Sequence, residues 1–407
     1  CGTPAASSES SLLDNSRLTG DWGGSRSDWE DKGWEFNLFN TQFYQGVASG
    51  GLEQEWAYGG KLDYLIDFDG TKSGLWEGLL VNFHAETRYG EDVNVAGGLL
   101  TPSNIVMSFP SPDAHVSSIT GLKLTQAVSE NVVLFAGKIN TLQEYPLKYR
   151  PGPTTNLPGL GGFMNTSLVF NSIMGRTVPY STFGVGAAFL AEGFPIASVT
   201  AFDPRERVTD GLDELYKDGV TIVPNLLLPM QLLGRPGVLN LGGTYSAADY
   251  RSVDPEAWLE LPPEVIAAGG PVESESWALY ANFYQALWVH PQDKGRTWGF
   301  FGQFGYSDGN PNPVRFVANG GIGGRSMLAG RTLDTFGIGY FYLGLSDEFT
   351  TLASPFIELQ DEPGIEIFYN FAVKPWCRLT YDLQVVNPSA TALDTAIITG
   401  LRLQTLF

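Results

Sequence analysis

Hydrophobic and polar residues alternate along most of the chain, and this spacing of two is typical of β-strands with two different faces. Near the end of the chain, for example, Tyr381 and Leu383 flank Asp382. The pattern predicts strands at 34–46, 55–68, 78–89, 117–128, 131–141, 180–191, 194–203, 219–228, 237–247, 276–289, 297–307, 332–343, 347–357, 363–374, 376–387 and 394–407.

The connections between these strands sort into two kinds. Short turns are expected at 129–130, 192–193, 290–296, 344–346 and Pro375, and further short turns are expected to begin at Asp69-Gly70 and at Pro229. Long loops are expected at 90–116, 142–179, 204–218, 248–275 and 308–331. Alternating short and long connections in an even antiparallel series are typical of an outer-membrane barrel.

The expected fold is therefore all-β, a transmembrane antiparallel β-barrel of about 16 strands with short periplasmic turns and long extracellular loops. Residues 1–33 are expected to form an N-terminal tether and periplasmic segment, and residues 34–407 the barrel. The third loop, 142–179, is expected to fold into the lumen, with packing over the barrel mouth as the alternative.

Composition narrows the class further. The chain has 49 Gly, 10 Trp, 17 Tyr and 25 Phe but only 17% charged residues, which suits twisted strands and turns better than helices. No stretch reaches the roughly 18 uninterrupted apolar residues that a membrane helix requires. The formal net charge of −20, without clustered Lys and Arg, argues against nucleic acid as a partner.

Both ends of the sequence carry signals of their own. Cys1 precedes a polar stretch, GTPAASSESS, which resembles the tether of a lipid-modified cysteine; the alternative is that a cysteine stands there by chance. Phe407 ends an alternating strand and resembles the signal read by barrel-assembly machinery, at the level of an aromatic girdle. Trp22 and Trp29 are expected to anchor the N-terminal segment at the periplasmic end of the barrel. Cys1 and Cys377 predict no disulfide framework.

Three stretches carry a family resemblance: LTGDWGGSRSDWEDKG, WGFFGQFGYSDGNPNPV and EIFYNFAVKPWCRLTYDLQVVNPS. Together they resemble the carbohydrate-selective (OprB-like) outer-membrane porins. The resemblance implies passive diffusion of mono- or oligosaccharides through a constricted, water-filled pore in a Gram-negative-type outer membrane. It also implies a monomer or a weak homo-oligomer surrounded by outer-membrane lipid. At LQEYPLKYRPGPTTNLPGLGGF the chain departs from the family pattern.

A sugar pore needs charges and hydrogen-bonding groups at its narrowest point. Alternation points His84, Glu86 and Arg88 inward from the third strand. In the same way Lys138 is expected to point inward from the fifth strand, with Phe135 on the lipid side. LFAGKINT also resembles a family stretch that has a basic residue after glycine. Glu86, Arg88 and Lys138 are the first candidates for the pore eyelet, and His84 is a further one.

Charged residues outside those two strands are weaker candidates. Arg150 and Arg176 could reach the eyelet from the third loop. Arg378, Asp382 and Arg402 are expected to point inward as wall charges. For each eyelet candidate the alternative is an ordinary solvated charge of the lumen or surface.

Catalytic chemistry finds little support. The three histidines, His84, His115 and His290, lack metal-ligand spacing, and the GGIGG stretch at 320–324 is expected to be a flexible external loop rather than a nucleotide-binding loop. We predict no enzyme, no metal and no cofactor. The alternatives are a porin for other small solutes, such as organic anions, and a secreted β-rich sugar-binding protein that would stay in solution without detergent.

Overall fold

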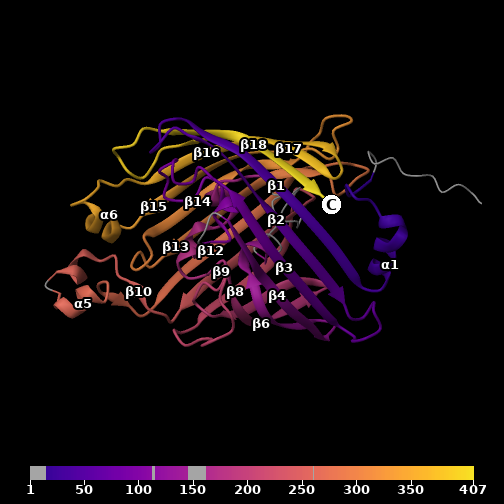
Figure 1. Cartoon of the computed structure of the whole chain (residues 1–407), viewed down its shortest axis with the longest axis horizontal. Coiled ribbons are helices and arrows are strands. Elements are labelled where there is room, and N and C mark those ends of the chain that lie inside the picture. The colour runs from indigo at the N-terminus through magenta and orange to yellow at the C-terminus, as the bar shows by residue number, and fades with distance from the viewer. Residues whose placement is uncertain (1–14, 112–114, 145–161, 260) are drawn as a thin grey trace, which may run out of the picture.

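The computed structural model describes residues 15–111, 115–144, 162–259 and 261–407, which form an elongated barrel (Figure 1). Within these residues sixteen antiparallel strands close into one barrel, and each pairs with its neighbours along the chain. The strands are β1 (Trp34–Ser49), β2 (Trp56–Asp69), β3 (Leu79–Gly90), β4 (Val116–Ser129), β5 (Val132–Asn140), β6 (Ser181–Ala191), β7 (Phe194–Phe202), β8 (Thr221–Leu232), β9 (Arg235–Ser246), β12 (Ser276–Val289), β13 (Thr297–Ser307), β14 (Val314–Arg325), β15 (Thr335–Leu345), β16 (Glu362–Lys374), β17 (Cys377–Val386) and β18 (Ala396–Leu406). The predicted closed barrel is confirmed.

The described helices are short and belong to the segments before and between the strands of the barrel wall. They are η1 (Trp22–Gly24), α1 (Ser25–Asp31), α2 (Ile105–Ser108), α4 (Thr166–Val169), η2 (Ser172–Arg176), η3 (Pro255–Trp258), α5 (Pro263–Ala267) and α6 (Asp347–Ala353). A separate hairpin of β10 (Tyr250–Arg251) and β11 (Val272–Glu273) stands in the connection between β9 and β12. Among the described residues, no helix has both the length and the apolar character needed to cross a membrane.

The two faces of the wall differ as the alternation predicts. In the β17–β18 pair, Tyr381 lies opposite Leu401 and Thr380 lies opposite Arg402. Tyr381 is 52% exposed on the outside, whereas Arg402 is 1% exposed on the inside. Because residues that face each other across a ladder share a face of the sheet, this strand pair has an apolar outer face and a polar inner face.

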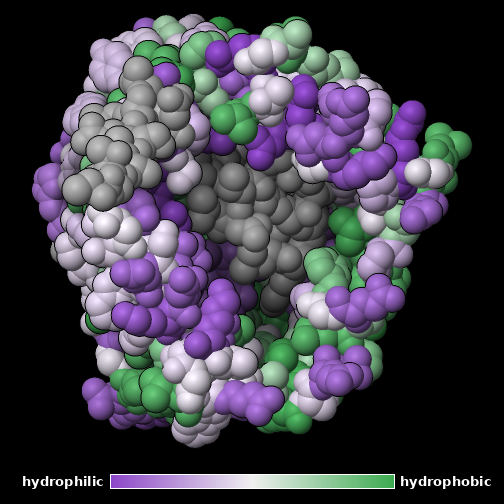
Figure 2. Space-filling model, turned by 90° about the vertical axis from the view of Figure 1, so that its right-hand side faces the viewer, coloured by the Kyte–Doolittle hydropathy of each residue, from purple (hydrophilic) through white to green (hydrophobic). Residues whose placement is uncertain are grey.

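The two ends of the barrel also differ. Turns such as 130–131, 192–193, 233–234 and 375–376 lie at the end that carries α1, and the long connections 91–115, 141–180, 203–220 and 247–275 lie at the opposite end with α5 and α6 (Figure 1). Figure 2 looks onto the α1 end and shows a hollow in the middle of the molecule, with hydrophilic residues around much of its rim. The predicted separation of short turns at one end from long loops at the other is therefore confirmed, except for the connections predicted at 308–331 and 344–346.

The strand predicted at 347–357 is wrong. Its first part is helix α6, because the hydroxyl of Ser346 accepts a hydrogen bond from the backbone N–H of Phe349 at 3.2 Å. Asp347 and Glu348 occupy the first turn, where acidic side chains favour the helix dipole. These capping residues outweigh the local alternation, and the predicted short turn at 344–346 is instead the start of a longer connection.

The expected loop at 308–331 is also wrong, since it contains strand β14. Gly320 and Gly324, the ends of the GGIGG stretch, both lie in this strand and pair with β13 and β15. A side chain at Gly321 would meet the carbonyl oxygen of Ile338 at 2.1 Å, so close packing against the neighbouring strand requires glycine there. The predicted turn beginning at Pro229 is displaced too, because β8 continues to Leu232.

The barrel closes where β1 meets β18, and the N-terminal segment fastens this seam. The backbone N–H of Phe407 donates to the carbonyl oxygen of Leu38 at 3.0 Å. Arg26 of α1 is 3% exposed, and both its terminal nitrogens lie 3.2 Å from the carbonyl oxygen of Phe407. A single guanidinium thus joins the segment before β1 to the end of β18.

Replacing Arg26 with alanine is expected to lower barrel stability by about 2 kcal/mol, because two charge-assisted hydrogen bonds at a buried position are lost. To measure this loss of stability, samples are heated to increasing temperatures before SDS gel electrophoresis, and the temperature at which the fast-migrating folded band disappears is recorded. Arg235→Ala, at the exposed first residue of β9, is the matched control. Equal transition temperatures for the two variants would contradict the seam role.

Candidate functional site

The third loop, which joins β5 to β6, lies on the inner wall over its described residues. The side-chain amide of Asn171 donates to Asn282 at 3.1 Å and to the carbonyl oxygen of Phe304 at 3.2 Å. The amide of Asn312 donates to the carbonyl oxygen of Ile173 at 3.0 Å. Because these partners belong to or follow strands β12 and β13, across the barrel from β5, the predicted inward fold is confirmed for the described part of the loop.

Glycines in the wall let the loop approach closely. A Cβ atom at Gly305 would stand 2.7 Å from Cγ2 of Ile173, and one at Gly339 would stand 2.8 Å from Cδ2 of Leu168. Distances this short exclude any larger residue unless the loop moves away. The glycine content of β13 to β15 therefore serves the packing of the loop, whose buried apolar side chains fill this side of the lumen.

A carboxylate on β16 holds the start of the described loop. Glu366 is fully buried and accepts the backbone N–H groups of Met164 at 2.5 Å and Asn165 at 3.0 Å. Asn165 also donates to Gln384 at 3.1 Å, and Arg402 donates to the carbonyl oxygen of Gly162 at 3.0 Å. The inward direction predicted for Arg402 is correct, and its charge binds the loop backbone.

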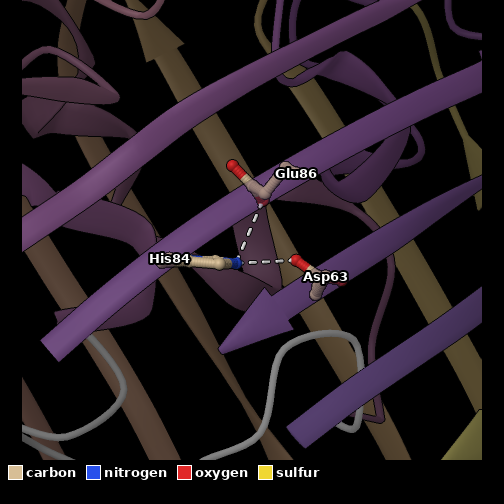
Figure 3. Close-up of side chains that lie close together, drawn as sticks. All are labelled: Asp63, His84 and Glu86. Carbon is tan, nitrogen blue, oxygen red and sulfur yellow. Dashed lines mark hydrogen bonds and ion pairs between the residues drawn. The ribbon is translucent and has the colours of Figure 1, made fainter. Parts of the chain in front are cut away.

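Four ionisable side chains from two neighbouring strands form the charged cluster, defined as Lys61, Asp63, His84 and Glu86. The register places Asp63 directly opposite Glu86. The ammonium group of Lys61 lies 2.5 Å from Oε1 of Glu86 and 3.4 Å from Oδ1 of Asp63. Nε2 of His84 lies 2.9 Å from Oδ1 of Asp63 and 3.7 Å from Oε1 of Glu86. Figure 3 shows the three residues Asp63, His84 and Glu86 pointing toward one another.

Polar groups at the loop ends complete the hydrogen bonding of this cluster. The hydroxyl of Tyr180 donates to Oε2 of Glu86, and the amide of Asn140 donates to the same oxygen at 3.3 Å. The backbone N–H of Tyr180 in turn donates to Glu206, in the connection after β7, at 2.7 Å. Burial raises the pKa of Glu206 even though backbone N–H groups favour its charged form. The cluster is thereby tied to the loop 203–220.

The cluster contains ligand types suited to a metal ion, since donor atoms of Asp63, His84 and Glu86 all lie within 4.8 Å of one another. However, the ammonium group of Lys61 already contacts both carboxylates. A second cation at this point would be repelled by the first. The structure therefore supports an internally compensated charge network, and we assign no metal to it.

The three candidates from the third strand all lie on the inner wall, as predicted. His84 and Glu86 belong to the charged cluster, whereas Arg88 lies further along β3 and donates to the carbonyl oxygen of Met107. The guanidinium of Arg88 is 3.8 Å from the carboxylate of Asp92. All three are less than a tenth exposed, so each is held in place by its partners.

The prediction for Lys138 is wrong. Lys138 lies opposite Leu122 and Phe183 in the ladder, and Leu122 is 46% exposed on the outer wall. Its ammonium group donates to the carbonyl oxygens of Val208 at 2.9 Å and Asp210 at 3.4 Å. Phe135 and Ile139 take the inner face instead, because the apolar residues of the inward loop pack against this part of the wall. Alternation misled here since both faces are apolar.

Arg176 does not join the charged cluster in the structure. Arg176 donates to the carbonyl oxygen of Arg251 at 3.2 Å, and its guanidinium lies 5.1 Å from the ring centre of Tyr250. It therefore contacts the β10–β11 hairpin, and the expectation that it reaches the eyelet is wrong for this arrangement. Burial lowers the pKa of Arg176. Arg150 and Cys1 lie outside the described residues.

Lys61 and Asp63 were missed as candidates from the sequence. Their signal was present, because both stand on the polar face of the alternating stretch that became β2. What alternation could not supply is the register that puts Lys61 opposite Arg88 and Asp63 opposite Glu86. Glu366, on the polar face of the stretch that became β16, was likewise not among the candidates.

Comparison with known proteins decides the family. A sequence model described as "Carbohydrate-selective porin, OprB family" matches residues 53–407. The chain belongs to the OprB family. A comparison with curated protein sequences gave no match.

Solved structures of porins share the fold of this OprB-family chain. The high-pH structure of Pseudomonas putida OprB matches with a TM-score of 0.83 at 18% identity, covering 98% of this chain and 100% of that one. The low-pH structure of the same protein gives 0.59 at 17% identity, covering 97% and 99%. OpdL of Pseudomonas aeruginosa gives 0.51 at 12% identity, covering 92% and 98%.

Family and fold together make this protein an outer-membrane carbohydrate porin, a channel with sugars as its solutes. The family resemblance expected from the three sequence stretches is confirmed. The secreted β-rich alternative is set aside, since sixteen of the described strands close into one barrel with exposed hydrophobic residues on its outer wall.

Proposed function

We propose that the charged cluster, together with Arg88 and the inward loop, forms the constriction through which mono- or oligosaccharides diffuse passively. The observation that carries this proposal is the pairing of charges on the wall. Two basic side chains, Lys61 and His84, face the carboxylates of Asp63 and Glu86, and Arg88 has Asp92 nearby. A wall with balanced charges offers hydrogen-bond donors and acceptors to hydroxyl groups while exerting little net field on an ion.

The same balance argues against the second candidate, a porin for organic anions. Such a pore needs an excess of basic groups at the constriction, as in the Arg and Lys rings of anion pores. In the described part of the wall around β2 and β3, the carboxylates match the basic side chains instead. We therefore favour neutral sugars as the solutes. We infer that the protein lies in a Gram-negative-type outer membrane and catalyses no reaction. Oligomeric state remains a prediction of the family resemblance.

Replacing Arg88 with alanine is expected to weaken sugar block of the ion current by about tenfold, since one charge-assisted hydrogen-bonding group is lost. It should also shift the reversal potential toward cations, because Asp92 and Glu86 keep their charges. Planar-bilayer recording with sugars of increasing length would measure both effects.

Lys138→Ala is the matched control for this experiment. It removes one positive charge from the outer face of β5, which β4 separates from β3, so sugar block should stay at the level of the unchanged protein. If Lys138→Ala altered sugar block and Arg88→Ala did not, the proposed constriction would be misplaced. A steep anion preference unaffected by any sugar would argue for the organic-anion pore.

A further inference from the structure

The segment before β1 does not hang free below the barrel but wraps around the end of β1. On the inner side, Arg17 donates to Asn37 at 3.0 Å. On the outer side, the rings of Trp22 and Trp29 lie 6.5 and 6.1 Å from the ring of Phe36. Phe36 belongs to the same face of β1 as Tyr44, which is 51% exposed on the lipid-facing wall. The helix α1 therefore lies outside the barrel rim.

Aromatic side chains at this rim form one continuous group, which we call the rim cluster: Trp22, Trp29, Trp34, Phe36 and Phe68. Trp34 is 6.2 Å from Phe36 and 4.6 Å from Phe68 between ring centres. Trp22 and Trp29 are each 47% exposed, so a large apolar area remains uncovered. The cluster continues directly into the lipid-facing surface of β1 and β2.

The backbone conformation at Trp22 indicates that contacts with neighbouring residues fix the orientation of its ring. Its φ angle is 51°, in the left-handed region that bulky residues avoid at a cost of about 1 kcal/mol. The indole N–H donates to the hydroxyl of Thr19 at 3.1 Å, and the guanidinium of Arg26 stacks 4.2 Å from the ring centre. These contacts hold one edge of the ring and leave the rest exposed.

The charged residues around the rim cluster determine which lipid headgroups it can contact favourably. Asp28 and Asp31 of α1 are exposed, beside a single exposed lysine, Lys32, which lies 5.8 Å from the ring centre of Trp29. Arg17 and Arg26 are engaged with the barrel. The outward charge of α1 is therefore negative, which disfavours anionic headgroups and favours headgroups that carry an amine.

We propose that the segment 15–33 is an interfacial membrane anchor, in which Trp22 and Trp29 insert at headgroup level of the leaflet at the α1 end. Asp28 and Asp31 face the positively charged amines of net-neutral phospholipids. Indole rings favour this depth because one edge can hydrogen-bond while the body stays apolar. This anchor fixes the depth of the barrel in the bilayer, and it is independent of which sugar passes.

Tryptophan quenching by brominated phosphatidylcholine tests the anchor on the full chain folded into vesicles. The double variant Trp22→Phe/Trp29→Phe should lose a fluorescence component that bromines near the headgroup quench more strongly than bromines near the acyl-chain ends. Trp258→Phe, in an external loop, is the control and should lose no such component. Heat-modifiable gel migration verifies that each barrel is folded. A Trp22/Trp29 component that neither lipid quenches, as expected for water or for contact with a second copy, overturns the proposal.

Lipid charge is tested in the same assay with phosphatidylglycerol added at low salt. Headgroup-level quenching of the Trp22/Trp29 component should fall in the unchanged protein and stay constant in Asp28→Asn/Asp31→Asn. Equal behaviour of the two proteins would overturn the selection of net-neutral headgroups.

Discussion

Replacing Glu366 with alanine is expected to release the inward loop and enlarge the pore. The backbone N–H groups of Met164 and Asn165 would lose their acceptor in a buried place, at a cost of about 1–3 kcal/mol each. Single-channel conductance should rise, with added flicker, and vesicle swelling should admit longer oligosaccharides than the unchanged protein does.

Two further variants sharpen that experiment. Glu366→Gln keeps an acceptor oxygen of the same reach and should give an intermediate conductance. Glu348→Ala removes a carboxylate that pairs with Arg315 at 2.8 Å outside the inward loop, so it should leave the pore size unchanged. Conductance of Glu366→Ala equal to that of Glu348→Ala would show that the loop stays in place without this carboxylate.

Replacing Lys61 with methionine is expected to have the largest effect on stability. Asp63 and Glu86 would remain buried with their shared ammonium partner gone, and an uncompensated buried charge costs about 3–5 kcal/mol. The net charge of the wall around β2 and β3 would also become more negative. We expect a lower unfolding temperature of the folded band on SDS gels and a reversal potential shifted strongly toward cations.

The double variant Lys61→Met/Glu86→Gln separates these two causes. Removing both members of the pair restores the charge balance, so it should recover most of the cation shift and part of the lost stability. The coupling energy from this double-mutant cycle then measures the pair itself. If the single variant were as stable and as weakly selective as the unchanged protein, the charged cluster would play no part in the constriction.

Several individual residues show how far sequence reasoning reached. Arg378, Asp382 and Arg402 were placed inward correctly, because their strands are apolar on one face only. Lys138 was placed inward and lies outward, because Phe135 and Ile139 make the inner face of β5 apolar as well. Alternation identifies the lipid face only where the lumen side is polar, and it does not reveal that the loop after β5 folds back and packs apolar side chains against this side.

Glycine and helix capping explain two further errors. Four of the five residues at 320–324 are glycines without side chains that could alternate, so β14 left little pattern to detect, although it pairs with both of its neighbours. Ser346 and the acidic residues after it start α6 by local hydrogen bonding, a signal that the alternation reading passed over. Both errors arose where a strand's pattern was absent or was overridden by a local contact.

The sequence by itself determined that this chain forms a barrel with an apolar outer face and that it resembles the OprB family. It also determined that most short turns and most long loops lie at opposite ends of the barrel. Strand alternation and turn residues are local properties, so they can be read along the chain. Only the tertiary structure decided that Lys61 and Asp63 meet His84 and Glu86, and that Glu366 holds Met164 two hundred residues away. Those contacts depend on strand register and on the path of a loop across the lumen, which no local pattern encodes.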